Sequence, residues 1–567
     1  MDPIIKFENF TWKYNAQAEP TLHEINLEIY AGEKVLICGP SGCGKSTLAH
    51  CLNGLIPFSY RGESSGSLTI FGKETKNLSI FDISKMVGTV LQDSDSQFVG
   101  LTVAEDIAFA LENDCVPQDE LFRRVAKVAE EVNVGMVLHH APTELSGGQK
   151  QRVSLGGVMV DDVPIFLFDE PLANLDPATG KQAIELIDEI RKTRNATEII
   201  IEHRLEDVLW RDVDRIVLMQ DGRIAADVTP DQLLASDLLK TYGIREPLYI
   251  TALKYAGVEI TPEKAPHSIR SIKLPDEDIK AVRSWYFNAL ESTKHSESEI
   301  LLNAEHITFA YDNGCKALDD VSIRVRKGEM LAIVGRNGAG KSTFSKLVCG
   351  FETPQKGSIH FRDKDLAKLS IKERADSIGY VMQNPNQMIS QVMITDEVAL
   401  GLKTRGVPED EIKRRVEDTL KICGLYPFRK WPVSALSYGQ KKRVTIASIL
   451  VLDPEIIILD EPTAGQDFRH YTEIMEFLRD INRKGITVIM ITHDMHLMLE
   501  YCDRAVVLAD GKKLADTGCA AVLTDPDLIE RASLKLTSLY DLAMLCGIDD
   551  AEGFVRCFIA RDREVRA

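Results

Sequence analysis

The sequence predicts an α/β fold that is built twice in tandem, each time around a largely parallel sheet. Three short motifs of the first half, at residues 39–47, 145–149 and 166–171, recur in the same order in the second half. In each half, short apolar runs alternate with charged, periodic segments, as strands and helices do in parallel α/β folds. A repeat this long indicates a duplicated domain rather than a solenoid.

Individual elements follow from local patterns. Residues 34–39 and 330–335 are apolar runs that lead into glycine-rich turns, and we expect buried strands there. Residues 119–133 and 409–423 are charged and periodic, which predicts helices on the surface of each copy.

The repeat and the composition between its copies suggest domain boundaries. We expect the first domain at 1–235 and the second at 300–525. Residues 236–299 are mixed in charge and contain several prolines, which predicts a linker with some helix, as at Asp276–Asn288. Residues 526–567 are expected to form a small helical C-terminal appendage.

Composition narrows the function classes. The chain has 567 residues, of which 44% are hydrophobic and 27% charged, so it has material for full cores. A net charge of −19 argues against general nucleic-acid binding, which needs clustered Lys and Arg. No apolar run is long enough to span a membrane, and the N-terminus lacks a signal pattern. The 11 cysteines form no Cys-x-x-Cys pair, which predicts reduced thiols.

A Gly-x4-Gly-Lys-Ser phosphate-binding loop occurs in both copies. Its glycines let backbone N–H groups surround phosphates, and the helix that follows adds a favourable dipole. Lys45 and Lys341 are expected to reach the β- and γ-phosphates of ATP, and Ser46 and Ser342 to bind Mg²⁺. One such pattern can arise by chance, but two at matched positions leave chance negligible. The full predicted set is Gly39, Ser41, Gly42, Gly44, Lys45, Ser46, Thr47, Gly335, Asn337, Gly338, Gly340, Lys341, Ser342 and Thr343.

Two further apolar runs end in a pair of carboxylates. The first carboxylate, Asp169 or Asp460, fits a role in organising Mg²⁺. The second, Glu170 or Glu461, fits a general base that polarises the attacking water. The alternative is an ordinary strand end with two solvated carboxylates. The accompanying phosphate loops argue against this alternative.

These motifs, with Leu-Ser-Gly-Gly-Gln at 145–149 and Leu-Ser-Tyr-Gly-Gln at 436–440, resemble the ATPase subunits of ABC transporters. The resemblance implies P-loop NTPase domains of ABC type, each with a mainly parallel core sheet, an antiparallel β-subdomain and a helical signature subdomain. In that family two domains pair head to tail, and each ATP lies between one phosphate loop and the opposite signature. Here the pairing would be intramolecular. The signature residues implied are Ser146, Gly147, Gly148, Gln149, Ser437, Gly439 and Gln440.

The same resemblance assigns four residues near the γ-phosphate. Gln92 and Gln383 look like the Q-loop glutamines that sense Mg²⁺ and the attacking water. His203 and His493 each follow an apolar run and look like the switch histidines, which we count as catalytic together with Glu170 and Glu461.

Two other pairs carry over by local context. Asp176 and Asp467 look like the D-loop aspartates of the domain interface. Tyr14 and Tyr311 could stack on adenine, or they could be ordinary strand aromatics. The adjacent pair at 139–140, two histidines, has no such context and is expected at the surface.

Tyr438 departs from the family pattern, which has glycine at this position of the signature. Its side chain could crowd the γ-phosphate of the site that contains Lys45, or it could point away. Because both copies retain the glutamate and the histidine, we expect both sites to hydrolyse ATP.

The loops after Gln92 and Gln383 are similar to those of energy-coupling factor importers, especially the fused double-ATPase form of the cobalt or hydroxymethylpyrimidine-thiamine type. Such importers imply a membrane-embedded T-component, a solute-capturing S-component, and a peripheral ATPase on the cytoplasmic face of the cell membrane. Residues of these loops, Gln97, Phe98, Gln387 and Met388, would line the docking surface, unless the loops simply face solvent.

Two rival classes remain. One is a soluble double-ABC ATPase that acts on ribosomes or nucleic acid; the acidic charge and the missing Cys-x-x-Cys pairs disfavour it. The other is the ATPase of another ABC importer class, such as one for sugars, which the Gln-Asn-Pro-Asn-Gln run at 383–387 disfavours.

Overall fold

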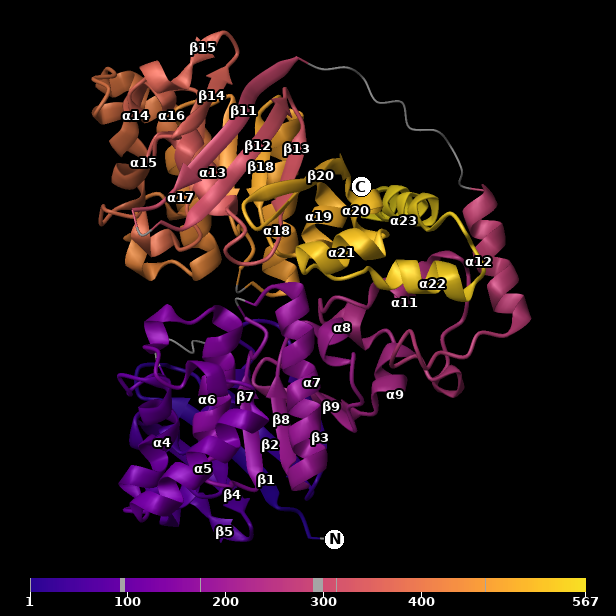
Figure 1. Ribbon diagram of the computed structural model, residues 1–567. Coiled ribbons are helices and arrows are strands. Elements are labelled where there is room, and N and C mark those ends of the chain that lie inside the picture. The colour runs from indigo at the N-terminus through magenta and orange to yellow at the C-terminus, as the bar shows by residue number, and fades with distance from the viewer. Residues whose placement is uncertain are drawn as a thin grey trace. The chain divides into compact units, whose positions relative to one another are not determined.

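The computed structural model describes residues 2–91, 97–173, 175–288, 299–312, 314–464 and 466–566. They divide into two compact units (Figure 1). The first unit holds the described residues up to Val282 together with 467–469, and the second unit holds the others. The first part of the expected linker therefore belongs to the first unit. Each unit contains two sheets and a set of helices, as the duplicated α/β prediction requires.

The core of the first unit is a six-stranded sheet in the order β10-β9-β3-β8-β7-β6, parallel except for β10. A separate antiparallel sheet has the order β2-β1-β4-β5. The strands are β1 (Ile5–Tyr14), β2 (Leu22–Ile29), β3 (Lys34–Cys38), β4 (Gly62–Ile70), β5 (Lys73–Glu74), β6 (Val87–Val90), β7 (Ile165–Asp169), β8 (Thr197–Ile201), β9 (Arg215–Gln220) and β10 (Arg223–Val228).

Helices of the first unit cover the sheets and extend into the connecting segment. They are α1 (Lys45–Leu52), α2 (Leu55–Phe58), α3 (Ile80–Ser84), α4 (Val103–Asn113), α5 (Gln118–Glu131), α6 (Gly147–Met159), α7 (Pro177–Arg194), α8 (Leu205–Val208), α9 (Pro230–Leu234), α10 (Leu238–Thr241), α11 (Leu248–Tyr255) and α12 (Asp276–Asn288). The helix α12 coincides with the helix expected within the linker, and it crosses the unit boundary, with its residues from 283 on in the second unit.

The second unit repeats this architecture. Its six-stranded sheet has the order β16-β17-β18-β13-β19-β20 and its antiparallel sheet the order β12-β11-β14-β15. The strands are β11 (Ile300–Ala310), β12 (Lys316–Arg326), β13 (Met330–Val334), β14 (Lys356–Phe361), β15 (Lys364–Asp365), β16 (Ile378–Val381), β17 (Ile456–Asp460), β18 (Thr487–Ile491), β19 (Arg504–Ala509) and β20 (Lys512–Gly518).

Helices of the second unit include those of the C-terminal segment. They are α13 (Lys341–Cys349), α14 (Ile371–Arg374), α15 (Ile394–Lys403), α16 (Glu409–Ile422), α17 (Tyr438–Leu450), α18 (Phe468–Arg483), α19 (Met495–Tyr501), α20 (Cys519–Leu523), α21 (Pro526–Ala532), α22 (Ser538–Leu545) and α23 (Ala551–Arg566). Among the described residues, none of the helices of either unit combines the length and apolar character that a membrane crossing needs.

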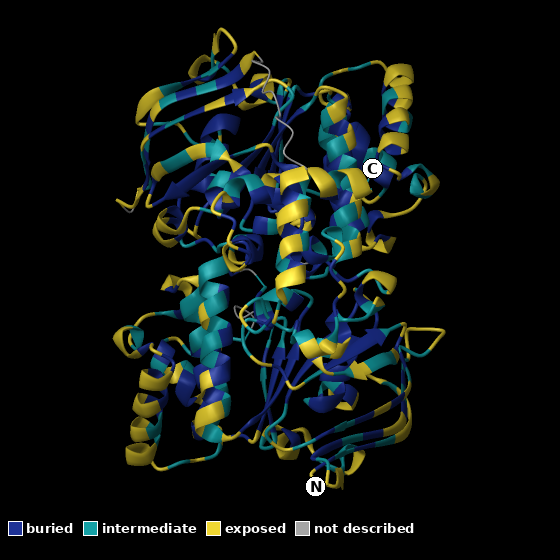
Figure 2. Ribbon diagram, turned by 90° about the vertical axis from the view of Figure 1, so that its right-hand side faces the viewer, coloured by how far each residue is buried: buried dark blue, intermediate teal, exposed yellow. Residues whose placement is uncertain are grey.

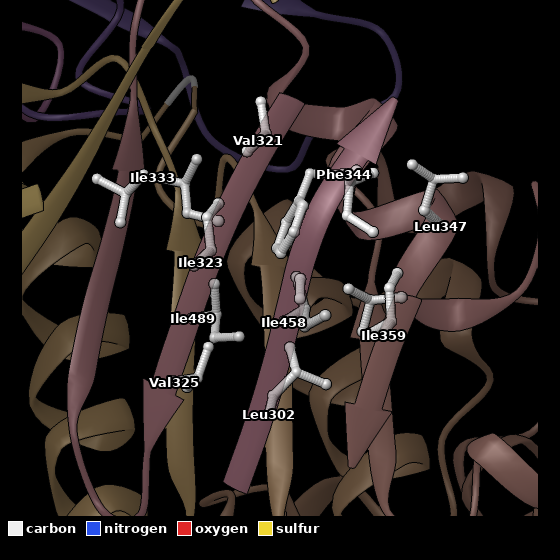
Figure 3. Close-up of a cluster of buried hydrophobic side chains, with 14 of the residues drawn as sticks. Leu302, Val321, Ile323, Val325, Ile333, Phe344, Leu347, Ile359, Ile458 and Ile489 are labelled. Atoms are coloured by element: carbon white, nitrogen blue, oxygen red, sulfur yellow. The ribbon is translucent and has the colours of Figure 1, made fainter. Parts of the chain in front are cut away.

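The hydrophobic core fixes the helix that follows each phosphate loop. In the second unit, one buried cluster joins the antiparallel sheet, through Ile323 and Ile359, to the parallel strands, through Ile458 and Ile489. Phe344 of α13 lies in this cluster, between the two sheets (Figure 3). The central strands of the parallel sheets are buried, whereas the outer helix faces and the edge strands are partly exposed (Figure 2). The two layers therefore hold α13 rigidly at the end of β13.

Candidate active sites

Each phosphate loop connects a central parallel strand to the helix behind it, β3 to α1 and β13 to α13. Glycine is required at the start of the loop: Gly39 has a φ of 154°, and a Cβ there would lie 2.3 Å from the carbonyl oxygen of Met219. In the second unit the same clash, at Gly335, would be with Leu508 at 2.0 Å. Only glycine lets the strand-to-helix turn pass this close to the neighbouring strand.

Both loop lysines are buried and directed over the loop backbone. Lys45 donates from Nζ to the carbonyl oxygens of Gly39, at 2.8 Å, and Pro40, at 2.9 Å. Lys341 donates in the same way to Gly335, at 2.7 Å, and to the next residue, at 3.0 Å. Each ammonium group is therefore held within the ring of backbone that the sequence predicted as a phosphate cradle.

The two predicted adenine tyrosines are tied to the helix after the loop. Tyr14 and Thr47 share a hydroxyl hydrogen bond of 3.1 Å, and Tyr311 and Thr343 share one of the same length. Both tyrosines are half-buried against the core of their unit, while the two threonines are buried. The contact places each ring beside its phosphate loop, and stacking on adenine stays a prediction.

The predicted Asp–Glu pairs lie at the ends of β7 and β17, each separated from its phosphate-loop strand by one strand, β8 or β18. Burial, reinforced by the charge of Glu170, raises the pKa of Asp169 to about 6. Burial also raises the pKa of Asp460, against hydrogen bonds from Tyr380 and Ser342 that act in the opposite direction. The hydroxyl of Tyr380 donates to Asp460 Oδ2 at 3.0 Å.

The two glutamates adopt an unusual backbone conformation. Glu170 and Glu461 have φ angles of 48° and 44°, in the left-handed region that non-glycine residues rarely occupy. Such conformations cost about 1–3 kcal/mol and cluster at functional sites. The same strained geometry in both units marks the glutamates as residues whose side-chain direction matters.

In the second unit, the predicted histidine contacts the glutamate directly. His493 Nδ1 lies 2.7 Å from Glu461 Oε1, and the backbone N–H of His493 donates to the same oxygen at 3.1 Å. The hydroxyl of Thr492 donates to Glu461 Oε2 at 3.2 Å. The buried glutamate therefore accepts hydrogen bonds on both oxygens.

The first unit contains a further carboxylate at this point. Glu202 immediately precedes His203, is fully buried, and lies 3.1 Å from His203 Nδ1, whereas Glu170 lies 3.8 Å away. Burial disfavours the charged imidazole, but the neighbouring carboxylates outweigh it and raise the pKa of His203. Burial likewise opposes ionisation of Glu170, yet contact with His203 leaves its pKa lowered. A charged residue directly after the apolar run 199–201 was the available sequence signal for Glu202, and we missed it.

Both signature motifs start a helix. Ser146 caps α6 in a reciprocal box with Gln149, and Ser437 caps α17 with Gln440 in the same way. Gly148 must be small, because a Cβ there would lie 2.4 Å from the methyl carbon of Thr179 on α7.

Asp176 caps the start of α7, accepting the backbone N–H of Thr179 at 3.0 Å. Asp467 directly precedes α18. The histidines at 139 and 140 are exposed, as expected.

The side chain of Tyr438 is directed to the Q-loop of its own unit. Its hydroxyl donates to the carbonyl oxygen of Gln383 at 3.4 Å. Lys442, one helical turn further along α17, donates to the carbonyl oxygens of Met382 and Gln383, each at 2.8 Å. The sequence analysis did not single out Lys442, whose side chain is buried. Gln92, the glutamine predicted for the first unit, lies outside the described residues.

Two of the residues predicted for docking make internal contacts. The Gln97 side chain accepts the N–H of Leu91 and donates to the carbonyl oxygen of Thr89, both at 3.2 Å. The sulfur of Met388 accepts the N–H of Met382 at 3.1 Å. Both contacts close the loop onto the end of a sheet strand. Phe98 is half-buried and Gln387 is exposed, so both remain candidates for a docking surface.

Comparison with known proteins identifies the family. A family model described as ABC transporter matches residues 22–173 and 318–464. A relative from Clostridium perfringens, an ABC transporter ATP-binding protein, is 60% identical over 563 residues, 99% of either chain. The chain belongs to the ABC transporter ATP-binding proteins. This confirms the predicted family, the two ABC-type α/β domains, and ATP binding and hydrolysis coupled to transport.

This ABC ATPase is also similar to other proteins. A relative from Enterococcus faecalis is 57% identical over 565 residues, covering 100% of this chain and 99% of the relative. A family model described as ATP-binding cassette cobalt transporter matches residues 236–309. The solved structure of cbiO1 from Clostridium perfringens, part of the ABC transporter complex cbiONQ, is 34% identical, covers 44% of this chain and 100% of that chain, and has a TM-score of 0.39.

Proposed function

We propose that this ABC ATPase drives an energy-coupling factor importer of a vitamin, a vitamin precursor or a metal cation, with ATP hydrolysed at two composite sites. The observation that supports two active sites is the glutamate–histidine pair at the end of the parallel strands in each unit. One site would combine Lys45 with the signature residues Ser437 and Gly439. The other would combine Lys341 with the first signature, Ser146 and Gly148.

Each residue has a distinct task in the proposed reaction. The loop lysine and the backbone N–H groups bind the phosphates and hold the γ-phosphate for in-line attack. The carboxylate of Glu170 or Glu461 takes a proton from the attacking water, and the neighbouring histidine orients that carboxylate. The strained backbone of the glutamate directs its side chain toward the reacting centre.

The strand-end residues also suit Mg²⁺. In the second unit the Ser342 hydroxyl hydrogen-bonds the Asp460 carboxylate, so two hard oxygen ligands converge beside Lys341. Asp169 and Ser46 would serve in the first unit. Magnesium, when bound, neutralises charge on the β- and γ-phosphates.

Exposed hydrophobic side chains at matched positions support docking onto a membrane partner. Leu101 and Val392, which precede α4 and α15, are 82% and 75% exposed. Phe109 on α4 and Leu400 on α15 are also exposed. Large exposed apolar side chains that recur in both units favour a protein-binding surface. We propose that it binds the T-component, with a separate S-component capturing the solute, and that the ATPase is peripheral on the cytoplasmic face of the cell membrane. The cobalt-transporter description of the family model at 236–309 supports this importer class.

Replacing the glutamates tests the two sites. Glu170→Gln and Glu461→Gln should each lower ATP hydrolysis, and the double variant should lose at least about 100-fold while still binding ATP. Glu130→Gln, an exposed change on α5, is the matched control. Wild-type turnover in either single variant would contradict the two-site proposal.

A reconstituted importer tests the partner and the solute. Phe98→Asp should reduce co-purification with the T-component and spare ATP binding, whereas Phe122→Asp, an exposed change on α5, should leave both intact. Uptake assays with vitamins, vitamin precursors and cobalt would then identify the solute. Full ATPase activity without any associated membrane protein would favour the soluble double-ABC class instead.

A further inference from the structure

The two units differ at the residue that precedes the switch histidine. The strands β8 and β18 end at matched positions, and each histidine follows two residues later. The intervening residue is Glu202 in the first unit and Thr492 in the second, and both are fully buried. A carboxylate and a hydroxyl therefore occupy the same buried place beside two otherwise similar glutamate–histidine pairs.

In the second unit, Thr492 forms a hydrogen bond to Glu461 and does not compete with Glu461 for the ring of His493. Its hydroxyl donates to Glu461 Oε2 and accepts the backbone N–H of Asp494 at 2.9 Å. The ring of His493 is left to Glu461, with Nδ1 2.7 Å from Oε1. The glutamate and the histidine are thus assembled as a contacting pair.

In the first unit, the Glu202 carboxylate accepts hydrogen bonds from backbone N–H groups around the glutamate–histidine pair. Its Oε1 accepts the backbone N–H groups of His203, at 2.8 Å, and Arg204, at 3.2 Å. Its Oε2 accepts the N–H of Leu172, at 3.3 Å, two residues beyond Glu170. These bonds fix the carboxylate, and its Oε1 lies closer to the His203 ring than Glu170 does, at 3.1 Å against 3.8 Å.

We propose that Glu202 competes with Glu170 for the ring of His203 and makes the first unit's site the slower of the two. A buried carboxylate attracts an imidazole N–H more strongly than a hydroxyl does, because charge-assisted hydrogen bonds are the stronger ones. Glu202 is a positioning residue: it contacts the histidine and the loop backbone and acts on the reaction through them. The inference rests on the proposed roles of Glu170 and Glu461 as general bases.

Single-site backgrounds separate the two rates. In full-length Glu461→Gln, turnover comes from the first unit's site, and in Glu170→Gln it comes from the second. We expect the second site to have a kcat at least about threefold higher. Adding E202T to the first background should raise its kcat to within about twofold of the second site, with the KM for ATP unchanged.

The reciprocal substitution strengthens the test. T492E in the Glu170→Gln background should lower kcat, because the new carboxylate would draw His493 away from Glu461. A gain of turnover in E202T separates positioning from a purely structural role, since loss of a structural contact does not accelerate a reaction. Glu130→Gln in the Glu461→Gln background, an exposed change on α5 of the same unit, is the matched control and should leave kcat unchanged.

Three outcomes would overturn the inference: equal kcat at the two sites, an unchanged or lower kcat in E202T that keeps its thermal stability, or a change confined to KM. If E202T loses stability, T492E carries the test alone, and an unchanged kcat there refutes it. The proposed function fails differently: near wild-type hydrolysis in the Glu170→Gln/Glu461→Gln double variant would rule out both glutamates as general bases, whatever Glu202 does.

Discussion

At one position of the parallel sheet, the first unit buries two charged side chains where the second unit has apolar ones. Lys34 on β3 and Glu198 on β8 are neighbours in the parallel register, and both are 0% exposed. In the second unit the same register pairs Met330 with Val488. One molecule therefore contains both a charged and an apolar version of the same core position, and we predict that the charged version depends on both partners.

The structure sets the expected magnitude. K34M removes the buried positive charge that lies near Glu198, and uncovering a buried carboxylate in this way costs up to about 3–5 kcal/mol. Burial raises the pKa of Glu198, so proton uptake relieves part of the loss, and we expect about 3 kcal/mol at pH 7. At roughly 2–4 °C per kcal/mol, the first unit should melt about 6–12 °C lower.

The double variant K34M/E198V should recover most of this loss. Replacing both charges by apolar side chains is often neutral or stabilising by about 1–4 kcal/mol. Asp188, whose Oδ1 lies 3.7 Å from Lys34 Nζ, keeps Lys192 as a partner at 2.7 Å and is not stranded. The second unit already shows that this place in the sheet accepts an apolar pair.

Tryptophan fluorescence can report one unit at a time during thermal unfolding of the full chain. Of the four tryptophans, Trp12 and Trp210 belong to the first unit, and Trp285 and Trp431 to the second. A W285F/W431F background therefore leaves only first-unit signals.

The opposite change provides a control. M330K/V488E, followed in a W12F/W210F background, should not stabilise the second unit. The reasoning is refuted if K34M shifts the first-unit transition by less than about 2 °C, or if K34M/E198V melts no higher than K34M.

Three further predictions follow from contacts within single units. G148A should lower the first unit's stability by about 1–3 kcal/mol, because the new Cβ meets the methyl carbon of Thr179. Thermal unfolding of G148A/T179S should show recovery, since serine lacks that methyl group. No recovery of stability would count against the clash. Burial lowers the pKa of Lys442 to about 8, so the folded chain binds fewer protons than the unfolded chain between pH 8 and 10.5. Urea unfolding should therefore show wild-type stability rising relative to K442M across that window, and a constant difference would contradict it. Y14F removes the hydrogen bond to Thr47 but keeps the aromatic ring, so titration with a fluorescent ATP analogue should show near wild-type affinity. Y14A should bind the analogue more weakly. Equal affinities of Y14F and Y14A would argue against adenine stacking.

Several catalytic candidates could be predicted because their chemistry is written in consecutive residues. The loop around Lys45 and the pair ending in Glu170 are recognisable without a partner, since the strand, turn and ligand groups adjoin in the chain. Glu202 and Lys442 could not be predicted in this way. Their roles depend on burial and on contacts with distant parts of the chain, Glu202 with the N–H of Leu172 and Lys442 with the carbonyl oxygen of Met382.

Tyr438 and Gln97 illustrate the same limit. The sequence left two directions open for Tyr438, and the fold directs its hydroxyl to the carbonyl oxygen of Gln383. Gln97 was expected on a docking surface, but its amide satisfies backbone groups at the end of β6. In both cases a polar side chain beside a strand end binds the nearest unsatisfied backbone group, which sequence spacing alone does not reveal.

The sequence by itself determined the duplication, the ABC family and the residues predicted to bind phosphate, because these depend on short motifs whose geometry is local. Only the tertiary structure decided that the two copies are unequal. One unit buries Lys34 with Glu198 and sets Glu202 against His203, while the other places apolar residues and Thr492 there. The reason is physical: a motif needs only neighbouring residues in the chain, whereas the strength of a charge depends on burial and on the partners that folding brings to it.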